Sequence, residues 1–322
     1  MRRLLAFAAA VPLAFAAACG SSQPDPGPSP TASAAPAGVS ADAIEVRGAV
    51  GKKPEVKFPA GNPALVSASR TISEGEGEPA EDGDILAANV TVYNWDGKDN
   101  PYIGSDYDLG RGEFVTVSPQ LPKVLYEALR GAKPGGRVMA VVAKDALSSD
   151  QIEEAKQQGT DFTTANQVLV IDIVSKARKA VTGPSTDPGI KGIRLTDAGE
   201  GKAPSLSTKT DAKPSGKLVV KTVIKGDGPK VKADQTVVVH YIGKIWGSDK
   251  QFDSSWERGS PSVFPLSQVV KGWSDGLTGV PVGSRVVITI PPELGYGKEG
   301  NAQAGIKGTD TLVFVVDVLG AV

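Results

Sequence analysis

The chain contains the same sequence pattern twice. Residues 121–138, LPKVLYEALRGAKPGGRV, align without a gap on residues 269–286, VVKGWSDGLTGVPVGSRV, with identical Lys, Leu, Gly, Gly, Arg and Val. The tetrapeptides GKKP at 51–54 and GKAP at 201–204 match at a similar offset. A chain of 322 residues can hold two domains with separate cores. The repeat therefore predicts two duplicated domains rather than a solenoid.

A stretch rich in Gly, Pro, Ser and Thr around residues 182–189 separates the two copies. Such composition is typical of a connection rather than of a core. We expect the first domain over 44–181, a linker over 182–215 and the second domain over 216–322.

The second copy combines β-branched runs with one helical pattern. Ser267 is a candidate N-cap and Gly279 a candidate end for a short helix. Its apolar face would consist of Val269, Val270, Trp273 and Leu277. Strands are expected at 217–224, 235–246, 284–290 and 311–319. Each domain is thus predicted to be an α+β fold, in which a curved antiparallel β-sheet wraps around a short α-helix.

The composition narrows the chemistry that the chain can perform. One Cys and one His cannot build a zinc site, a disulfide framework or a Cys–His catalytic pair. A net charge of −1 without long Lys or Arg runs argues against nucleic acid as a partner. We therefore expect no metal and no cofactor. The single histidine, His240, lies on an alternating strand pattern, and we expect it to face away from Tyr241.

The N-terminus reads as a secretion signal over residues 1–18, with Arg2 and Arg3 before a short apolar stretch. Cys19 follows small residues, as in a bacterial lipobox, where the thiol is acylated. The alternative is ordinary cleavage that leaves a secreted protein with a free thiol. Residues 19–43 are rich in Pro, Ser, Ala and Gly and read as a disordered lipoprotein tether. We expect a lipid-anchored protein on the extracytoplasmic face of the cell membrane.

Several short motifs of the second copy occur in a recognisable order. They are Val239-His240-Tyr241, Phe252-Asp253-Ser254-Ser255, Gly272-Trp273, Ile290-Pro291-Pro292, Tyr296-Gly297 and Thr311-Leu312-Val313-Phe314. Over 216–322 the chain resembles the FKBP-type peptidyl-prolyl cis-trans isomerases. Lipoproteins with two FKBP-like modules are known from actinobacteria, and the Ala-, Gly- and Pro-rich composition suits such a source.

The resemblance implies a role for each matching residue. Trp273 would form the floor of a prolyl pocket, and Tyr241, Asp253 and Tyr296 would be the catalytic residues. Asp253 would be held by Tyr241, because a carboxylate beside an apolar cleft needs a hydrogen-bond partner. The substrate-binding residues would be Phe252, Phe264, Val269, Val270, Trp273, Ile306 and Phe314. Phe264 stands in for the family's pocket phenylalanine, since Ser262 occupies the usual position.

Physical reasoning independently fits this chemistry to a chain with few reactive groups. Rotation about an X–Pro amide crosses a barrier of about 18–20 kcal/mol, because resonance flattens the bond. An aromatic cleft cannot hydrate the planar amide as water does, and dipoles placed for the twisted form lower the barrier further. Such an enzyme needs neither a nucleophile nor a metal.

The first copy keeps the fold pattern but not the pocket. Gap-free alignment places Leu125 opposite Trp273 and Ser148 opposite Tyr296. With gaps, the alignment places Val90 opposite Tyr241, Ile103 opposite Asp253, Tyr102 opposite Phe252 and Ile171 opposite Phe314. We expect a folded, catalytically silent domain that serves client binding or spacing.

The resulting functional prediction is an isomerase that accelerates folding of secreted and surface proteins outside the cytoplasmic membrane. Its partners would be proline-containing segments of unfolded proteins, with macrolide FKBP ligands as further candidates. The alternative is a non-catalytic lipoprotein that binds proline motifs or clients as a chaperone. A structural lipoprotein whose domains scaffold partners is the third hypothesis.

Overall fold

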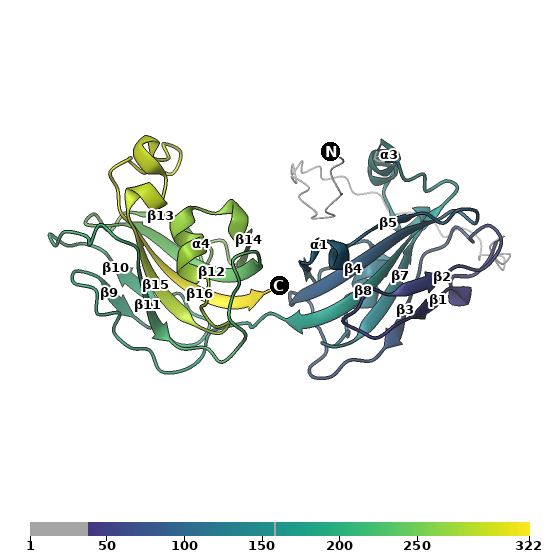
Figure 1. Ribbon diagram of the computed structural model, residues 1–322, viewed down its shortest axis with the longest axis horizontal. Helices are drawn as coiled ribbons and strands as arrows, with labels where there is room; N and C mark the ends of the chain where they lie inside the picture. The colour runs from purple at the N-terminus through teal and green to yellow at the C-terminus, as the bar shows by residue number, and fades with distance from the viewer. Residues whose placement is uncertain (1–37, 158) are drawn as a thin grey trace, which may run out of the picture.

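Two six-stranded antiparallel sheets, each crossed by a short helix, dominate the computed structural model (Figure 1). The structure describes residues 38–157 and 159–322. The expected signal peptide, Cys19 and most of the expected tether lie outside the described residues. The α+β class predicted from the sequence is confirmed.

The C-terminal sheet has the strand order β11-β15-β16-β12-β13, with β14 also paired to β12. Every pairing is antiparallel. Its elements are β11 (Val219–Ile224), β12 (Thr236–Ile245), β13 (Gln251–Ser254), β14 (Ser262–Pro265), α4 (Lys271–Leu277), β15 (Arg285–Ile290) and β16 (Leu312–Ala321). Helix α4 lies against the concave face of this sheet, and the side chains between them form the core of the C-terminal unit.

The N-terminal sheet repeats this topology strand for strand, in the order β3-β7-β8-β4-β5 with β6 paired to β4. Its elements are β3 (Ala68–Ser73), β4 (Ile85–Trp95), β5 (Tyr102–Ser105), β6 (Glu113–Thr116), α2 (Lys123–Leu129), β7 (Arg137–Val142) and β8 (Asn166–Lys176). Identical connectivity confirms that the sequence repeat reflects a duplicated fold.

Short helices complete the two units. They are η1 (Ala41–Ala43), α1 (Asp106–Leu109), η2 (Lys144–Ala146), α3 (Ser149–Gln157), η3 (Leu266–Gln268), η4 (Pro292–Leu294) and η5 (Gly297–Glu299). The predicted N-cap of α4 is wrong: Ser267 lies inside η3, and Val270 precedes α4 without a side-chain cap. The separate 3₁₀ turn displaces the start of α4 by three residues. No helix of the described residues is long and apolar enough to cross a bilayer.

A small β-hairpin precedes each six-stranded sheet. β1 (Glu45–Arg47) pairs with β2 (Glu55–Lys57), and β9 (Arg194–Thr196) pairs with β10 (Ser205–Ser207). The second hairpin lies within the stretch that composition predicts to be a linker. Its Ile193 and Leu206 are buried against the convex face of the C-terminal sheet. This part of the expected linker therefore packs as an integral part of the C-terminal unit.

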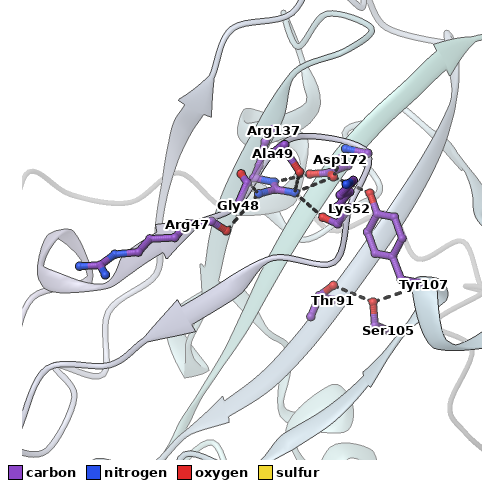
Figure 2. A network of polar contacts seen from close by, with 10 residues as sticks. Arg47, Gly48, Ala49, Lys52, Thr91, Ser105, Tyr107, Arg137 and Asp172 are labelled. Atoms are coloured by element: carbon purple, nitrogen blue, oxygen red, sulfur yellow. Dashed lines mark hydrogen bonds and ion pairs between the residues drawn. The ribbon is translucent and has the colours of Figure 1, made fainter.

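A buried ion pair attaches the hairpin to the sheet in the N-terminal unit (Figure 2). Arg137 and Asp172 come from neighbouring positions on β7 and β8, and each is 1% exposed. The Arg137 guanidinium also donates to the carbonyls of Gly48 (2.9 Å) and Lys52 (2.8 Å) in the hairpin loop. Tyr107 donates to Asp172 from the other side. These partners satisfy a charge pair that would otherwise be costly to bury.

The C-terminal unit contains a similar buried ion pair with other partners in the hairpin. Arg285 Nε donates to Asp317 Oδ1 at 2.6 Å, and Arg285 Nη1 reaches Asp197 in the hairpin at 2.8 Å. A hairpin carboxylate thus replaces the hairpin carbonyls of the first unit. In both copies the guanidinium connects the hairpin to the convex face.

The two units also contact each other through apolar residues. Ile85 and Val181 share a buried cluster with Val238 and Leu319 of the C-terminal unit. The backbone N–H of Arg178 donates to the Leu319 carbonyl at 2.9 Å, just beyond the end of β8. The connection between the units thus begins beside this apolar contact, where the ends of β8 and β16 lie near each other (Figure 1).

Candidate active site

Trp273 lies on the concave side of the C-terminal sheet, at the centre of a cluster of aromatic rings. Its ring centroid is 5.4 Å from that of Tyr241, 5.5 Å from Phe264 and 5.5 Å from Phe314. Interplanar angles of 77–88° make these edge-to-face contacts, which aromatic rings prefer over flat stacking. Trp273 is 4% exposed and is therefore held rigidly as a floor.

Two glycines let α4 lie close to the sheet, so that Trp273 on this helix reaches the aromatic cluster. A Cβ on Gly272 would collide with the side chain of Ile290, and one on Gly276 would lie 3.2 Å from Ile288. Helix interiors normally disfavour glycine, so its use twice in seven residues has a packing reason. The first copy has Val124 and Ala128 at these positions.

Gly243 and a β-bulge shape one side of the aromatic cluster. Gly243 pairs with Asp253 on β13 and with Phe314 on β16. The register shifts between Gly243 and Lys244, so Phe252 is the extra residue of a bulge, a device that re-aims side chains beside active sites. A Cβ on Gly243 would lie 2.6 Å from the Phe252 ring and 2.8 Å from the Phe314 ring. Because Gly243 has no side chain, the rings of Phe252 and Phe314 can meet there, with their centroids 5.4 Å apart.

A hydrogen-bonded network lies at the edge of the aromatic cluster. The Tyr241 hydroxyl donates to Asp253, as predicted, and Arg258 donates to Asp253 as well. Arg258 Nη2 further donates to the Tyr241 hydroxyl (2.9 Å) and to Ser262 Oγ (3.1 Å). Sequence reasoning did not single out Arg258, because an exposed loop arginine has no sequence pattern that reveals its partners.

The network sets the protonation of Tyr241. Burial and the hydrogen bond to Asp253 together raise the pKa of the Tyr241 phenol to about 12, although the hydrogen bond from Arg258 acts in the opposite direction. Hydrogen bonds to Asp253 and Tyr241 likewise raise the pKa of Arg258. The site therefore presents a neutral phenol held between a carboxylate and a guanidinium.

The other predicted residues surround the pocket to different degrees. Phe264, Val269 and Val270 are partly buried and pack on the aromatic cluster, and Ile306 is 4% exposed in it. Val270 precedes the first turn of α4, where backbone N–H groups have no intrahelical acceptor. Tyr296 lies between η4 and η5 and is 39% exposed. Among the predicted residues, Tyr296 and Asp253 are the ones outside the apolar cluster.

His240 faces the opposite side of the sheet, as its alternation with Tyr241 predicts. Its ring stacks on Trp256 with centroids 4.9 Å apart, and its Nδ1 lies 2.9 Å from Ser255 Oγ. Burial lowers the pKa of His240. It takes no part in the pocket.

Strand register corrects part of the alignment between the two copies. Val90 pairs with Ile171 as Tyr241 pairs with Val316, so Val90 does occupy the Tyr241 position. Val92 is the counterpart of Gly243. Val92 pairs with Gly104 and Leu169, and Gly243 pairs in the same way with Asp253 and Phe314. The expected matches of Ile171 to Phe314 and of Ile103 to Asp253 are therefore wrong: the counterparts are Leu169 and Gly104.

The aromatic match between Tyr102 and Phe252 is wrong for the same reason. Tyr102 pairs with Tyr93 as Gln251 pairs with Lys244, so the bulge residue that matches Phe252 is Ile103. Pairwise alignment could not place these residues because both strands contain a bulge. No residue of the first copy's wall thus keeps the polar or aromatic character of its partner in the second.

The concave face of the first copy is also filled by its own side chains. Phe162, 1% exposed, and Ala155 of α3 are buried in the same apolar cluster as Val124 and Leu129 of α2. Helix α3 and the residues after it replace the glycine-rich segment around Ile306 in the second copy. An aliphatic cluster with Phe162 thus occupies the place that the aromatic cluster around Trp273 occupies in the second copy.

Comparison with known proteins agrees with this geometry. Residues 228–319 match the family model described as FKBP-type peptidyl-prolyl cis-trans isomerase. A probable FK506-binding protein of Corynebacterium glutamicum is 42% identical over 104 residues, which cover 32% of this chain and 86% of that protein. An FK506-binding protein of Streptomyces anulatus is also 42% identical, over 108 residues that cover 33% of this chain and 87% of that protein.

Larger relatives match over the same portion only. The FKBP-type isomerase FkpA of Escherichia coli K12 is 43% identical over 102 residues, which cover 32% of this chain and 37% of that protein. The crystal structure of FkpA from Escherichia coli aligns with 36% identity and a TM-score of 0.32, over 41% of this chain and 53% of that one. This chain thus spans most of the small relatives but well under two thirds of FkpA.

Proposed function

This chain belongs to the family of FKBP-type peptidyl-prolyl cis-trans isomerases, and we propose that it accelerates the folding of secreted and surface proteins outside the cytoplasmic membrane. The observation that carries the proposal is the ring cluster around Trp273, bordered by Asp253. Uncatalysed X–Pro isomerisation takes tens to hundreds of seconds. A catalyst of this step is most useful where no ATP-driven chaperone acts.

The pocket would act first by desolvation. The prolyl ring would lie on Trp273, between Phe252 and Phe314, and the X–Pro amide would leave water with it. The planar amide is more polar than its twisted form, so the loss of hydration raises the ground state more than the transition state. The buried and mutually perpendicular rings are already in place before the substrate arrives, which limits reorganisation.

The Tyr241–Asp253–Arg258 network would supply the electrostatic part. Asp253 accepts from both Tyr241 and Arg258, so its negative charge is fixed in direction beside the apolar pocket. A fixed charge in a poorly hydrated site acts more strongly on a rotating amide than a solvated one. The N–H of Val270 and the hydroxyl of Tyr296 would hold the substrate carbonyls.

Proline-containing segments of unfolded proteins are the proposed substrates. The same pocket would admit macrolides, because relatives that match this unit are named FK506-binding proteins. Ser262 hydrogen-bonds to Arg258, whereas the ring of Phe264, two residues later, reaches 5.5 Å from Trp273. The presence of Ser262 where the family usually has a pocket phenylalanine would alter macrolide affinity more than turnover.

The first unit is proposed to be a non-catalytic partner of the second. Its sheet and helix remain, but Leu125 stands at the floor and Phe162 fills the concave side. A client-binding or spacing role is consistent with a fold that has kept its packing and lost its pocket.

A full-length assay tests the catalytic proposal. Trp273→Leu gives the second unit the floor of the first and should lower kcat/KM for a prolyl peptide by at least about tenfold, because the flat ring surface is lost. The matched control, Leu125→Ala, alters the equivalent residue of the first unit and should leave kcat/KM unchanged. A loss caused by Leu125→Ala, or none caused by Trp273→Leu, would contradict the assignment of the site.

The location is tested through Cys19, which lies outside the described residues. The proposed acyl anchor would hold the chain at the membrane, so Cys19→Ala should move it from the membrane fraction to the medium or the soluble fraction. Metabolic labelling with a fatty acid should mark the wild type and not the variant. Unchanged membrane association of Cys19→Ala would reject the anchor while leaving the isomerase intact.

A further inference from the structure

The β9–β10 hairpin does more than cover the convex face of the C-terminal sheet. The residues that follow β10 run alongside the turn between β12 and β13, and β13 carries Phe252 and Asp253. Strand β13 is an edge strand that pairs with β12 alone, at three positions. Its own ladder therefore holds it weakly, and its position depends on the turn that leads into it.

Thr208 connects the hairpin to this turn through each of its polar groups. Its N–H donates to Asp249 Oδ1 (2.8 Å), its Oγ1 donates to the Ile245 carbonyl (2.8 Å), and its carbonyl accepts from Gly247 N–H (2.8 Å). Thr208 is fully buried, so solvent cannot replace these bonds. Lys244 adds a second connection, because its Nζ donates to the Leu206 carbonyl and lies 3.2 Å from Asp249.

Asp249 has a backbone conformation that needs such support. Its φ of 59° is in the left-handed region, which non-glycine residues adopt at a cost. The carboxylate that accepts from Thr208 and Lys244 offsets this cost. The hydrogen bond from the Thr208 N–H also holds the pKa of Asp249 below its usual value.

The first copy provides an internal comparison. Asn100, with φ of 44°, precedes β5 by two residues as Asp249 precedes β13. Its side chain accepts from the N–H groups of Asp96 and Gly97 within the same turn, and Phe58 stands where the second copy has Thr208. In the catalytically silent copy the turn is closed by its own residues; in the copy with the pocket it is attached to the hairpin.

The same turn also contacts the segment on the other side of the pocket. Lys250 Nζ donates to the Gly305 carbonyl at 2.9 Å, next to the buried Ile306. The hairpin, the turn, the wall strand β13 and the loop at Ile306 thus form one continuous chain of contacts.

We propose that Thr208, Lys244 and Asp249 are positioning residues for the isomerase, which attach the β12–β13 turn to the hairpin and so hold Phe252 and Asp253 in place. The inference rests on the proposed catalytic role of this pocket. A misplacement of about 1 Å caused far from the chemistry can cost about 100-fold in rate, so the loss of one anchor is expected to be measurable.

The test uses the full-length chain and two substitutions that keep the local shape. Asp249→Gly permits the left-handed backbone while removing the carboxylate, and Thr208→Val removes the hydroxyl while keeping the side-chain volume. Each should lower kcat/KM for a prolyl peptide by about five- to tenfold. The matched control is Thr196→Val, which alters an exposed residue of β9 in the same hairpin and should leave kcat/KM unchanged. The wild-type rate reports on the catalytic function, whereas the ratio of variant to wild type reports on the positioning role.

A double-mutant cycle separates positioning from general destabilisation. In the Asp253→Ala background, Asp249→Gly should lower kcat/KM by a smaller factor than in the wild type, because one of the two side chains that the turn positions is already gone. Amide hydrogen exchange in Asp249→Gly should become faster at Phe252 and Asp253 and stay unchanged in β15. An equal loss in both backgrounds, or faster exchange throughout the sheet, would overturn the positioning role.

Discussion

At the scale of single residues, the pocket depends as much on glycines as on aromatic rings. Trp273, Tyr241 and Phe314 could be predicted because aromatic side chains are rare in this chain and follow a family order. Gly243 could not, since its contribution is an absent side chain at a point where Phe252 and Phe314 meet. Arg258 also escaped prediction, because an exposed arginine in a loop has no sequence signal until its partners are placed.

Filling the Gly243 position should close the pocket. Gly243→Ala would place a methyl group 2.6 Å from the Phe252 ring, so the rings must move. Overpacking of this kind costs about 1–3 kcal/mol in stability, and we expect at least a tenfold loss in kcat/KM for a prolyl peptide. Val92→Ala, at the equivalent position of the first unit, should not alter kcat/KM. Full activity of Gly243→Ala would show that the two rings do not define the pocket.

The protonation of Tyr241 predicts a flat activity profile at alkaline pH. Because burial raises its pKa to about 12, folding favours the protonated phenol. The resulting stabilisation is complete below about pH 10, the pKa of tyrosine in an unfolded chain, and is lost as the pH rises through about 12. A protease-free NMR exchange assay should give constant kcat/KM between about pH 7 and 10. A fall centred near pH 10 that Tyr241→Phe abolishes would contradict this environment.

At the scale of elements, the hairpins were the part of the fold that the sequence analysis did not anticipate. Strands β11, β12, β15 and β16 and helix α4 have long β-branched runs or a helical face, and periodicity predicted them. β9 and β10 have three residues each within a Gly- and Pro-rich stretch. Elements this short have no period to detect, and what stabilises them is burial of Ile193 and Leu206 on a distant surface.

The Arg285–Asp317 pair should be costly to break and cheap to replace as a whole. Arg285→Met leaves Asp317, 3% exposed, without its partner, and should lower the free energy of unfolding by about 3–5 kcal/mol. Arg285→Met combined with Asp317→Leu should recover most of that loss, as apolar replacements of buried pairs often do. Urea unfolding measures the stability of the single and the double variant. Arg194→Met, which alters an exposed arginine of the same hairpin, is the control. A double variant as unstable as the single one would show that the hairpin contact to Asp197 dominates instead.

At the scale of the whole molecule, duplication could be predicted from one ungapped repeat, and the shared strand order confirms it. The absence of the aromatic cluster from the first copy was also predictable, because Leu125 replaces Trp273 in that repeat. The exact correspondence of the wall residues was not, since the bulges at Ile103 and Phe252 shift the register.

Separated units should divide the activity unequally. Residues 184–322 include the hairpin and should keep kcat/KM within about twofold of the full-length protein, whereas residues 38–181 should show none. Residues 216–322, which lack the hairpin, should be less stable and less active than 184–322, because Val287 and Val313 lose their cover. Prolyl-peptide assays and thermal unfolding of the three fragments measure this. Measurable turnover by 38–181 would contradict the silent first unit.

The guanidinium that ties each hairpin to its sheet has a consequence for how this protein arose. Both copies have this contact and, among the described residues, the aromatic cluster around a tryptophan on the concave face occurs in the second copy, so we infer that the ancestral module already carried its hairpin when it was doubled. Scaffold and chemistry occupy opposite faces of one sheet, which means that mutations could erase a catalytic surface without loosening the framework behind it. Such a separation would let one copy give up turnover and still fold, as we propose for the first unit.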